Sequence, residues 1–290
     1  MSETSEPFVL RHSQADVFVP AGDDPRHALG RTTHLCVGAH QDDIEIMAYH
    51  GIATCYTEAD KAFAGVVVTD GAGSPRTGTY AEYSDAAMKE LRRQEQRTAA
   101  ALGRYAIQLQ LGYPSASVKA GSNGDLVEDL RQIFAVAQPE VLYLHNPADK
   151  HDTHVAVLIH CVLALRQLPP ETRPAQVYGC EVWRSLDWLP DEAKVALPVD
   201  AHPGLQASLL EVFASQLVGG KRYDLAVAGR QQANATFHRS HETDRIAAVT
   251  WALDMTALME EETASLENFI QLHLEQLSDD VRQRLRSLTP

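Results

Sequence analysis

Two short polar segments hold the residue types best suited to chemistry. His40, Asp42 and Asp43 come directly after an apolar run, and His151 and His154 follow about a hundred residues later. An imidazole and a carboxylate, joined by a second imidazole from elsewhere, form a ligand set of catalytic zinc that leaves one position open for water. Asp42, beside the candidate ligand Asp43, is then free to take a proton from that water. The pattern indicates a metallohydrolase.

Each segment on its own also has a purely structural explanation. Asp42 is suited to capping a helix N-terminus, where its charge favours the helix dipole. His151 and His154, three residues apart, suit the polar entry of a helix. However, Asp42, Asp43 and Glu45 lie within four residues and repel one another unless a cation or a helix terminus compensates. The two segments together therefore favour a metal site.

The elements that must position these residues alternate between apolar strands and helices. Strands are predicted at residues 34–39, 62–69, 106–111 and 141–145, and helices at 42–58, 82–102, 124–138 and 155–167. This alternation implies right-handed crossovers and a mostly parallel α/β sheet flanked by helices. Because both polar segments follow strands, we expect them to converge at the carboxyl edge of the sheet, where open α/β sheets bind ligands.

The rest of the chain is less regular. We expect residues 1–290 to form a single domain, because no linker, repeat or low-complexity tract interrupts them, and residues 1–33 to be an irregular N-terminal segment. Residues 170–290 are expected to cover the sheet and shape a substrate pocket. In this part, strands are predicted at 176–183 and 194–199, and helices at 203–217, 221–234 and 255–275.

Composition narrows the possible partners. The chain has 25 Lys and Arg residues against 39 Asp and Glu, a net charge of -14, which disfavours a nucleic-acid partner. It lacks the pattern of a signal peptide and has no apolar run near the roughly 20 residues that span a bilayer, so we expect no membrane partner. The expectation is a soluble cytoplasmic protein; a homo-oligomer stays open.

In this order and context the residues resemble the LmbE-like (PIG-L) family of zinc-dependent de-N-acetylases. The family motif of the Ala-His-Pro-Asp-Asp type resembles residues 39–43, with Gln41 at the proline position. Its His-Pro-Asp-His type motif resembles residues 151–154, with Thr153 where the family usually has Asp. Two further stretches are similar to the family: residues 69–71 and residues 92–96.

The resemblance implies a Rossmann-like sheet and hydrolysis of an N-acetyl group on a small molecule that contains an aminosugar. By position, His40, Asp43 and His154 would ligate Zn²⁺, and Asp42 would be the general base. His151 would polarise the amide oxygen or protonate the leaving amine. Iron, cobalt or manganese suits the same His/Asp set.

Several other residues are candidates for supporting roles. Arg76 and Asp70, in the loop after the second predicted strand, and His241, in a late polar cluster, are candidate substrate-binding residues. Asp152 and Glu45 are candidates for orienting the metal ligands.

Three further residues are candidates for roles near the motifs. His145 and Asp149 precede the second motif and are further candidates for orienting the ligands. Trp183 is a candidate for stacking on a sugar ring, although core packing is the more frequent role of such an aromatic residue.

Two rival functions remain at this point. A non-catalytic sugar- or metal-binding protein of the same fold stays open because of Gln41 and Thr153, although the free carboxylate of Asp42 counts against it. An HD-type metal phosphohydrolase would use the His151-Asp152 pair, but that class is mainly helical, unlike the strand that precedes the first motif.

Overall fold

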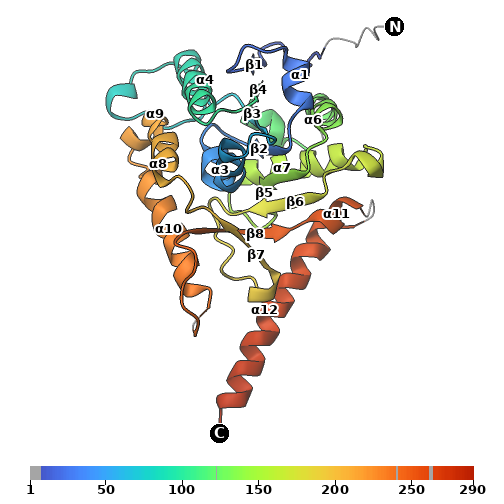
Figure 1. Cartoon of the computed structure of the whole chain (residues 1–290), viewed down its shortest axis with the longest axis vertical. Helices are drawn as coiled ribbons and strands as arrows, with labels where there is room; N and C mark the ends of the chain where they lie inside the picture. Colours follow the sequence, from blue (N-terminus) through green and yellow to red (C-terminus); the bar gives the residue numbers. More distant parts are fainter. Residues whose placement is uncertain (1–7, 122, 240, 261–263) are drawn as a thin grey trace.

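The computed structural model describes residues 8–121, 123–239, 241–260 and 264–290 (Figure 1). Its strands are β1 Asp16–Phe18, β2 His34–Gly38, β3 Phe63–Thr69, β4 Ile107–Tyr113, β5 Val141–His145, β6 Gln176–Cys180, β7 Lys194–Pro198 and β8 Val249–Asp254. In the described residues they form one eight-stranded sheet in the order β1-β4-β3-β2-β5-β6-β8-β7. The five strands from β4 to β6 are parallel, whereas β1, β8 and β7 pair antiparallel at the two edges.

Helices cover both faces of this sheet. They are α1 Pro25–Gly30, α2 Asp43–Met47, α3 Tyr49–Thr57, α4 Asp85–Leu102, α5 Ser115–Lys119, α6 Gly124–Ala137, α7 Asp152–Arg166, α8 Pro203–Glu211, α9 Ala214–Val218, α10 Tyr223–Phe237, α11 Thr256–Glu260 and α12 Leu266–Leu288. One hydrophobic core holds side chains of α1, α6, α7 and α11, and a second holds side chains of α2, α3, α4, α8 and α10. Helix α12 extends away from the body (Figure 1).

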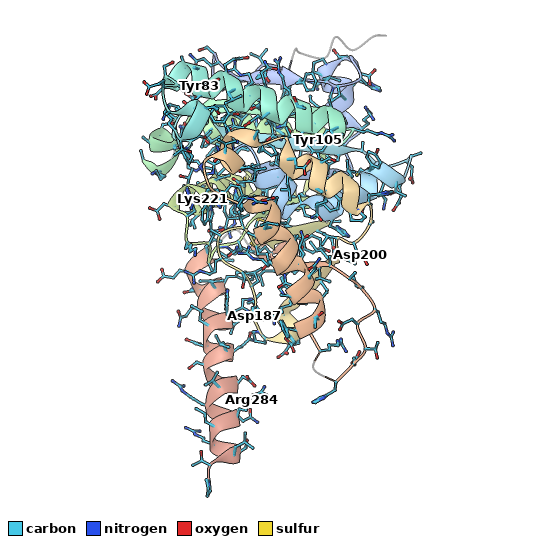
Figure 2. All side chains as sticks on the ribbon, turned by 90° about the vertical axis from the view of Figure 1, so that its left-hand side faces the viewer. Tyr83, Tyr105, Asp187, Asp200, Lys221 and Arg284 are labelled. Atoms are coloured by element: carbon cyan, nitrogen blue, oxygen red, sulfur yellow. The ribbon has the colours of Figure 1, made fainter. Side chains whose placement is uncertain are left out.

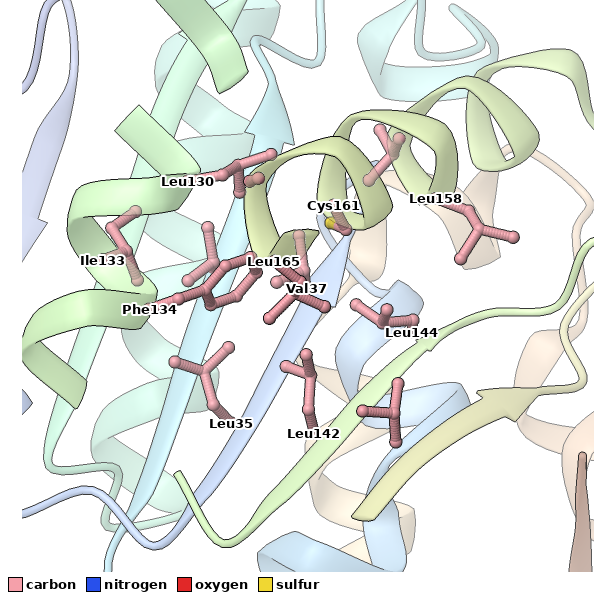
Figure 3. Close-up of a cluster of buried hydrophobic side chains, with 14 of the residues drawn as sticks. Leu35, Val37, Leu130, Ile133, Phe134, Leu142, Leu144, Leu158, Cys161 and Leu165 are labelled. Carbon is pink, nitrogen blue, oxygen red and sulfur yellow. The ribbon is translucent and has the colours of Figure 1, made fainter. Parts of the chain in front are cut away.

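The central strand β2 shows why both faces are covered. Leu35 and Val37 point into the first core, while Cys36 between them points into the second, as the two-residue period of a strand requires. Figure 3 shows the first core, in which side chains of α6 and α7 meet those of β2 and β5. This packing fixes α7, whose first turn carries the second polar motif.

The chain changes direction across the middle of the sheet. From β2 the crossovers lead to β3 and β4 on one side, and from β5 to β6 on the other, although β2 and β5 are parallel neighbours. At such a switch point the loops that leave adjacent strands diverge and open a crevice. His40 follows β2, and the segment with His151 follows β5. The fold therefore brings both motifs to one crevice.

This architecture confirms the predicted α/β fold with a mostly parallel, Rossmann-like sheet. Each strand predicted between residues 34 and 145 corresponds to one of β2 to β5. The helix predicted at 42–58 is divided at Ala48 into α2 and α3, and the one predicted at 203–217 is divided into α8 and α9. The helix predicted at 255–275 corresponds to α11 and part of α12, while residues 261–263 lie outside the described residues.

Two predictions were wrong, one for the N-terminal segment and one for the C-terminal half of the chain. The N-terminal segment 1–33, expected to be irregular, contains β1 and α1; its residues 1–7 lie outside the described part. Strand β8 was missed, and it pairs antiparallel with both β6 and β7. The two strands depend on long-range pairing rather than on a local pattern, since β1 has only three residues and gains its partners from β4. Among the described residues, no helix is long and apolar enough to cross a bilayer.

Candidate metal centre and cavity

The three candidate ligands converge at the switch point. His40 Nδ1 lies 3.3 Å from Asp43 Oδ2 and 3.2 Å from His154 Nε2, and His154 Nε2 lies 3.4 Å from the same Asp43 oxygen. Ligand atoms placed about 2.0–2.1 Å from a tetrahedral zinc ion lie about 3.3 Å from one another. The triangle of donor atoms therefore fits a divalent cation, with the fourth direction open.

Asp149 orients one of these ligands. Its Oδ2 lies 3.4 Å from His154 Nδ1, which favours the ring proton on Nδ1 and leaves the Nε2 lone pair for a metal. Asp149 also accepts the backbone N–H groups of His151 at 3.0 Å and Trp183 at 3.2 Å. The candidacy of Asp149 is thus supported by geometry, whereas Asp152 has a solvent-exposed side chain without a hydrogen bond or ion pair to any described residue of the cluster.

His145 lies close to the candidate ligands, but one of its ring nitrogens already accepts a backbone hydrogen bond. Its Nε2 accepts the N–H of Ala39 at 2.9 Å, so the lone pair that faces Asp43 at 3.5 Å is already in use. The ring stacks on His154 with 3.9 Å between centroids. His145 therefore supports the positions of both ligands, in agreement with the orienting role considered for it.

Asp42 does not cap helix α2. Its side chain forms no capping hydrogen bond, and its backbone has φ of 95° and ψ of -29°, a left-handed conformation that is unfavourable for a residue with a Cβ. The carboxylate is instead paired with Arg92, whose Nη2 lies 3.1 Å from Asp42 Oδ2 and also donates to the carbonyl of Gln41. The structural explanation by capping is wrong, and the carboxylate faces the cavity.

The two adjacent carboxylates have opposite electrostatics. Burial, opposed in part by Arg92, raises the pKa of Asp42 to about 6. Burial also acts to raise the pKa of Asp43, but His154 and His40 outweigh it and hold that pKa below its ordinary range. Asp43 is therefore anionic and suited to a cation, while Asp42 can exchange a proton near neutral pH.

His151 lies at the edge of the cluster. Its ring centroid is 4.9 Å from that of His40 and 4.5 Å from that of His154, and burial, with these two rings, lowers its pKa. His151 Nδ1 is buried without a hydrogen-bond partner among the described residues. On its other side, the ring of Trp183 lies 6.2 Å away in a nearly parallel orientation.

A cavity of about 490 Å³ opens over the cluster. Its walls combine the two motifs with the C-terminal part of the chain. They include His40, Asp42, Asp43, His151, Lys119, Glu181, Trp183, Lys221, Tyr223 and Arg230. Trp183, for which the sequence allows either stacking on a sugar or core packing, lines this cavity.

Arg76 and Asp70, the loop residues predicted to bind substrate, form contacts outside the cavity. Arg76 donates to the carbonyl of Tyr83 at 2.8 Å and pairs with Asp85, so it ties the loop to the start of α4. Asp70 forms an ion pair with Lys89 at 2.6 Å. Neither Arg76 nor Asp70 lines the 490 Å³ cavity, because nearby partners hold both side chains.

His241 and Glu45 also lie outside the lining of the cavity. His241 is solvent-exposed and is not among the cavity residues. Glu45 is fully buried, and its Oε1 accepts hydrogen bonds from Tyr105 Oη and Gln96 Nε2, both at 2.8 Å. Because Gln96 Oε1 accepts the N–H of Asp42 at 3.3 Å, Glu45 supports the Asp42 backbone rather than a metal ligand directly.

The two departures from the family motifs have local explanations. Gln41 is buried, and its Nε2 donates to the carbonyl of Thr69 and to Gln110 Oε1, both at 3.3 Å. It thus joins the first motif to the end of β3 and the middle of β4. Thr153 is buried and lines the cavity, and the carboxylate beside the second motif is supplied by Asp149.

Sequence reasoning missed several cavity residues in the C-terminal part. Lys221, Tyr223 and Arg230 lie in α10 or just before it, and Glu181 follows β6. The local sequence around them has the pattern of an ordinary solvated helix. Glu181 fell inside the strand predicted at 176–183, and only the earlier end of β6 at Cys180 places it after a strand, as His40 is after β2.

Comparisons with known proteins agree with this geometry. Residues 35–163 match the family model described as PIG-L, GlcNAc-PI de-N-acetylase. This range begins in β2 and ends in α7, and it includes both polar motifs. No curated protein matches the chain.

Solved structures share the fold at low identity. GalB, the 4-carboxy-2-hydroxymuconate hydratase of Pseudomonas putida KT2440, is 19% identical with a TM-score of 0.59, over 77% of this chain and 95% of that chain. The conserved protein TT1542 of Thermus thermophilus is 17% identical with a TM-score of 0.61, over 77% and 94%. The N,N'-diacetylchitobiose deacetylase of Pyrococcus horikoshii is 16% identical with a TM-score of 0.61, over 79% and 86%.

At these identities the likeness shows the fold alone, and the fold is shared by a hydratase and a deacetylase. The family match is more specific, because it covers the segments in which His40, Asp43 and His154 were found. The chain carries a PIG-L (LmbE-like) family domain over residues 35–163.

Proposed function

We propose that this protein is a metal-dependent deacetylase that removes an N-acetyl group from a small molecule containing an aminosugar. The observation that carries this proposal is the triangle of His40, Asp43 and His154 donor atoms at tetrahedral spacing, beside the carboxylate of Asp42 and open to the cavity. The family match supports the same reaction class.

In this proposal His40, Asp43 and His154 hold the cation. Zn²⁺ fits the ligand types, and Fe²⁺, Co²⁺ or Mn²⁺ suits the same set. A divalent cation held there supplies Lewis acidity, which lowers the pKa of water and polarises an acyl oxygen. Asp149 keeps the lone pair of His154 Nε2 directed at the cation site.

In this proposal Asp42 transfers the protons and His151 stabilises the charge on the acyl oxygen. Asp42 takes a proton as water attacks the acyl carbon, and a positioned base of this kind typically contributes about 100- to 10,000-fold. The neutral ring of His151 hydrogen-bonds the acyl oxygen as negative charge develops. The bond from the acyl carbon to nitrogen then breaks, Asp42 returns its proton to the amine, and acetate leaves.

The structure bears differently on the two rival functions, the phosphohydrolase and the binding protein. The HD-type phosphohydrolase is not retained, because its helical framework differs from the parallel sheet that carries His40. A binding protein without catalysis makes a distinct prediction: it binds metal and sugar but releases no acetate. The carboxylate of Asp42, which lines the cavity but neither caps a helix nor lies within the donor triangle, favours catalysis.

The test measures acetate release from N-acetylated aminosugars by protein loaded with Zn²⁺. Asp42→Asn is expected to lower kcat at least ~100-fold while metal binding persists, and His154→Gln is expected to lose the metal. Asp152→Asn serves as the control, because its side chain is exposed. Release of acetate at an equal rate by Asp42→Asn would refute the role of Asp42, and inert wild-type protein that binds metal would favour the binding protein.

A further inference from the structure

The outer segment of helix α12, residues 274–288, projects into solvent. Figure 1 shows it standing clear of the other described elements, and Figure 2, turned by 90°, places Arg284 on it. Every residue from 279 to 290 is exposed. A helical stretch of about 12 residues without tertiary contacts is marginal in water, because most helices in proteins are stabilised by packing of an apolar face. The outer segment therefore has the length of a helix but lacks the packing that normally supports one.

The apolar residues of the outer segment form a single stripe. Their intervals along the chain are 3, 4, 4 and 3 residues, and they are Leu274, Leu277, Val281, Leu285 and Leu288. Intervals of three and four residues return to the same face of an α-helix. Leu277 is half-buried, and the other four side chains are 43% to 80% exposed. Such a narrow stripe is typical of the seam between two paired helices.

The spacing of the stripe is the same in both directions from Val281. When a second copy of α12 lies antiparallel, with its Val281 beside this one, Leu277 meets Leu285 of the second copy. Leu274 likewise meets Leu288 of the second copy. Every apolar position then has an apolar partner, and each contact occurs twice, as the two-fold symmetry of a homodimer requires.

The charges on the outer segment favour the antiparallel direction. Residues 275–280 contain three acidic residues and no basic one, whereas residues 282–287 contain three arginines and no acidic residue. In an antiparallel pair the acidic half of each helix, with a charge of -3, lies beside the basic half of the other, with a charge of +3. A parallel pair places acid beside acid and base beside base. Charge complementarity of this kind selects the partner and its orientation.

Within one helix the same charges form weak pairs. Arg282 lies 3.3 Å from Asp279, and Arg284 lies 3.1 Å from Asp280, with all four side chains more than half exposed. Exposed pairs of this kind contribute little to stability in water. In the antiparallel arrangement Asp280 lies within one turn of Arg284 of the second copy, on the same flank of the stripe, so each carboxylate gains a second cation.

We propose that two copies of this chain pair through the outer segments of α12, as an antiparallel helix pair centred on Val281. The occupant of the stripe is thus a second copy of the chain. A helix that lies on a lipid surface is instead rich in Lys and Arg on its polar face, and the acidic half of the outer segment counts against that role. Among the described residues, none that lines the cavity belongs to α12, so pairing is independent of the proposed deacetylase function.

The first test is the mass of the protein in solution, measured by sedimentation and light scattering over a range of concentrations. We expect the mass to approach twice the 31.9 kDa of one chain as the concentration rises. Val281→Glu places two like charges at the centre of the pair and is expected to raise the dissociation constant at least ~100-fold. Leu272→Glu is the matched control, because Leu272 is similarly exposed but lies nine residues, or about two and a half turns, from Val281 and so on the opposite face.

Disulfide cross-linking tests the direction of the pair. Val281→Cys protein is expected to form a covalent dimer on oxidation. Leu288→Cys protein is not, because antiparallel pairing holds the two copies of residue 288 about 21 Å apart along the helices, too far for a disulfide. A mixture of Leu288→Cys and Leu274→Cys proteins should cross-link, and wild-type protein with its four free cysteines is the control. Equal cross-linking of Val281→Cys and Leu288→Cys would indicate a parallel pair and refute the arrangement.

Charge variants test what sets the direction. Changing the three arginines of residues 282–287 to Glu makes the outer segment wholly acidic, and changing the three acidic residues of 275–280 to Lys makes it wholly basic. Each variant alone is expected to be monomeric, whereas an equimolar mixture is expected to dimerise. Wild-type protein that is monomeric at every concentration, whether or not it binds vesicles of phosphatidylcholine and phosphatidylglycerol, would overturn the proposal. Equal dissociation constants for Val281→Glu and Leu272→Glu would overturn it as well.

Discussion

Replacing Arg92 by methionine tests the electrostatic support of the site. The Arg92 side chain is 1% exposed, and its Nη1 donates to Glu95 Oε2 at 3.0 Å and Ser215 Oγ at 3.2 Å, while Nη2 pairs with Asp42. Methionine keeps an unbranched apolar stem that reaches about as far as the Arg92 Nε, but it has no charge and no donors. The variant therefore leaves two buried carboxylates and the Gln41 carbonyl without their shared partner.

Breaking a buried ion pair by removing one partner typically costs about 3–5 kcal/mol, because the remaining charge stays buried and uncompensated. Glu95 keeps two donors, the N–H and Oγ of Ser215, each at 2.8 Å, so most of the cost falls on Asp42. We expect the free energy of unfolding to fall by about 3 kcal/mol or more, a large share of the roughly 5–15 kcal/mol typical of a folded protein. Activity is expected to fall as well, since Asp42 loses the group that holds it.

The assay is urea unfolding with a chelator present, because bound metal shifts apparent stability. Arg93→Met is the matched control on the same helix: Arg93 is 32% exposed and pairs with Glu90, so we expect a loss of about 0–1 kcal/mol. Adding Glu95→Gln to Arg92→Met should recover about 1 kcal/mol, because one buried negative charge that has lost its cation is removed. If Arg92→Met and Arg93→Met lose equal stability, the assignment of a buried, shared cation is refuted.

Two further perturbations test other parts of the molecule. Asp149→Asn is expected to weaken Zn²⁺ binding by about 10- to 100-fold, measured by competition with a chelator, because Asp149 orients His154, whereas an equal loss in Asp152→Asn would contradict the geometry. At the opposite end of β2, burial, together with Lys61, lowers the pKa of His34 from 6.5 to about 4. The neutral form is thus favoured on folding, so stability is expected to fall by up to about 3 kcal/mol as pH decreases from 6.5 to about 4. His34→Gln should flatten this part of the pH profile of urea unfolding, and an unchanged slope would show that His34 is not its source.

The central fold and the metal ligands could be predicted from the sequence because their signals are local. An apolar strand followed at once by His40 and Asp43 places both side chains at the carboxyl end of a strand. The alternation of strands and helices then requires a second such strand end nearby, where His154 stands in the first turn of α7. Spacing along the chain and the two-residue period of strands carry this information.

The tertiary structure alone decided which partners complete the site. Asp152 and Asp149 are equally plausible in the sequence, but α7 begins at Asp152 and turns that side chain to solvent, so that Asp149 faces His154. Arg92 meets Asp42 across 50 positions of the chain, and Lys221 reaches the cavity from the start of α10. Such contacts depend on how whole helices and strands pack against one another. No local pattern of residues specifies that packing.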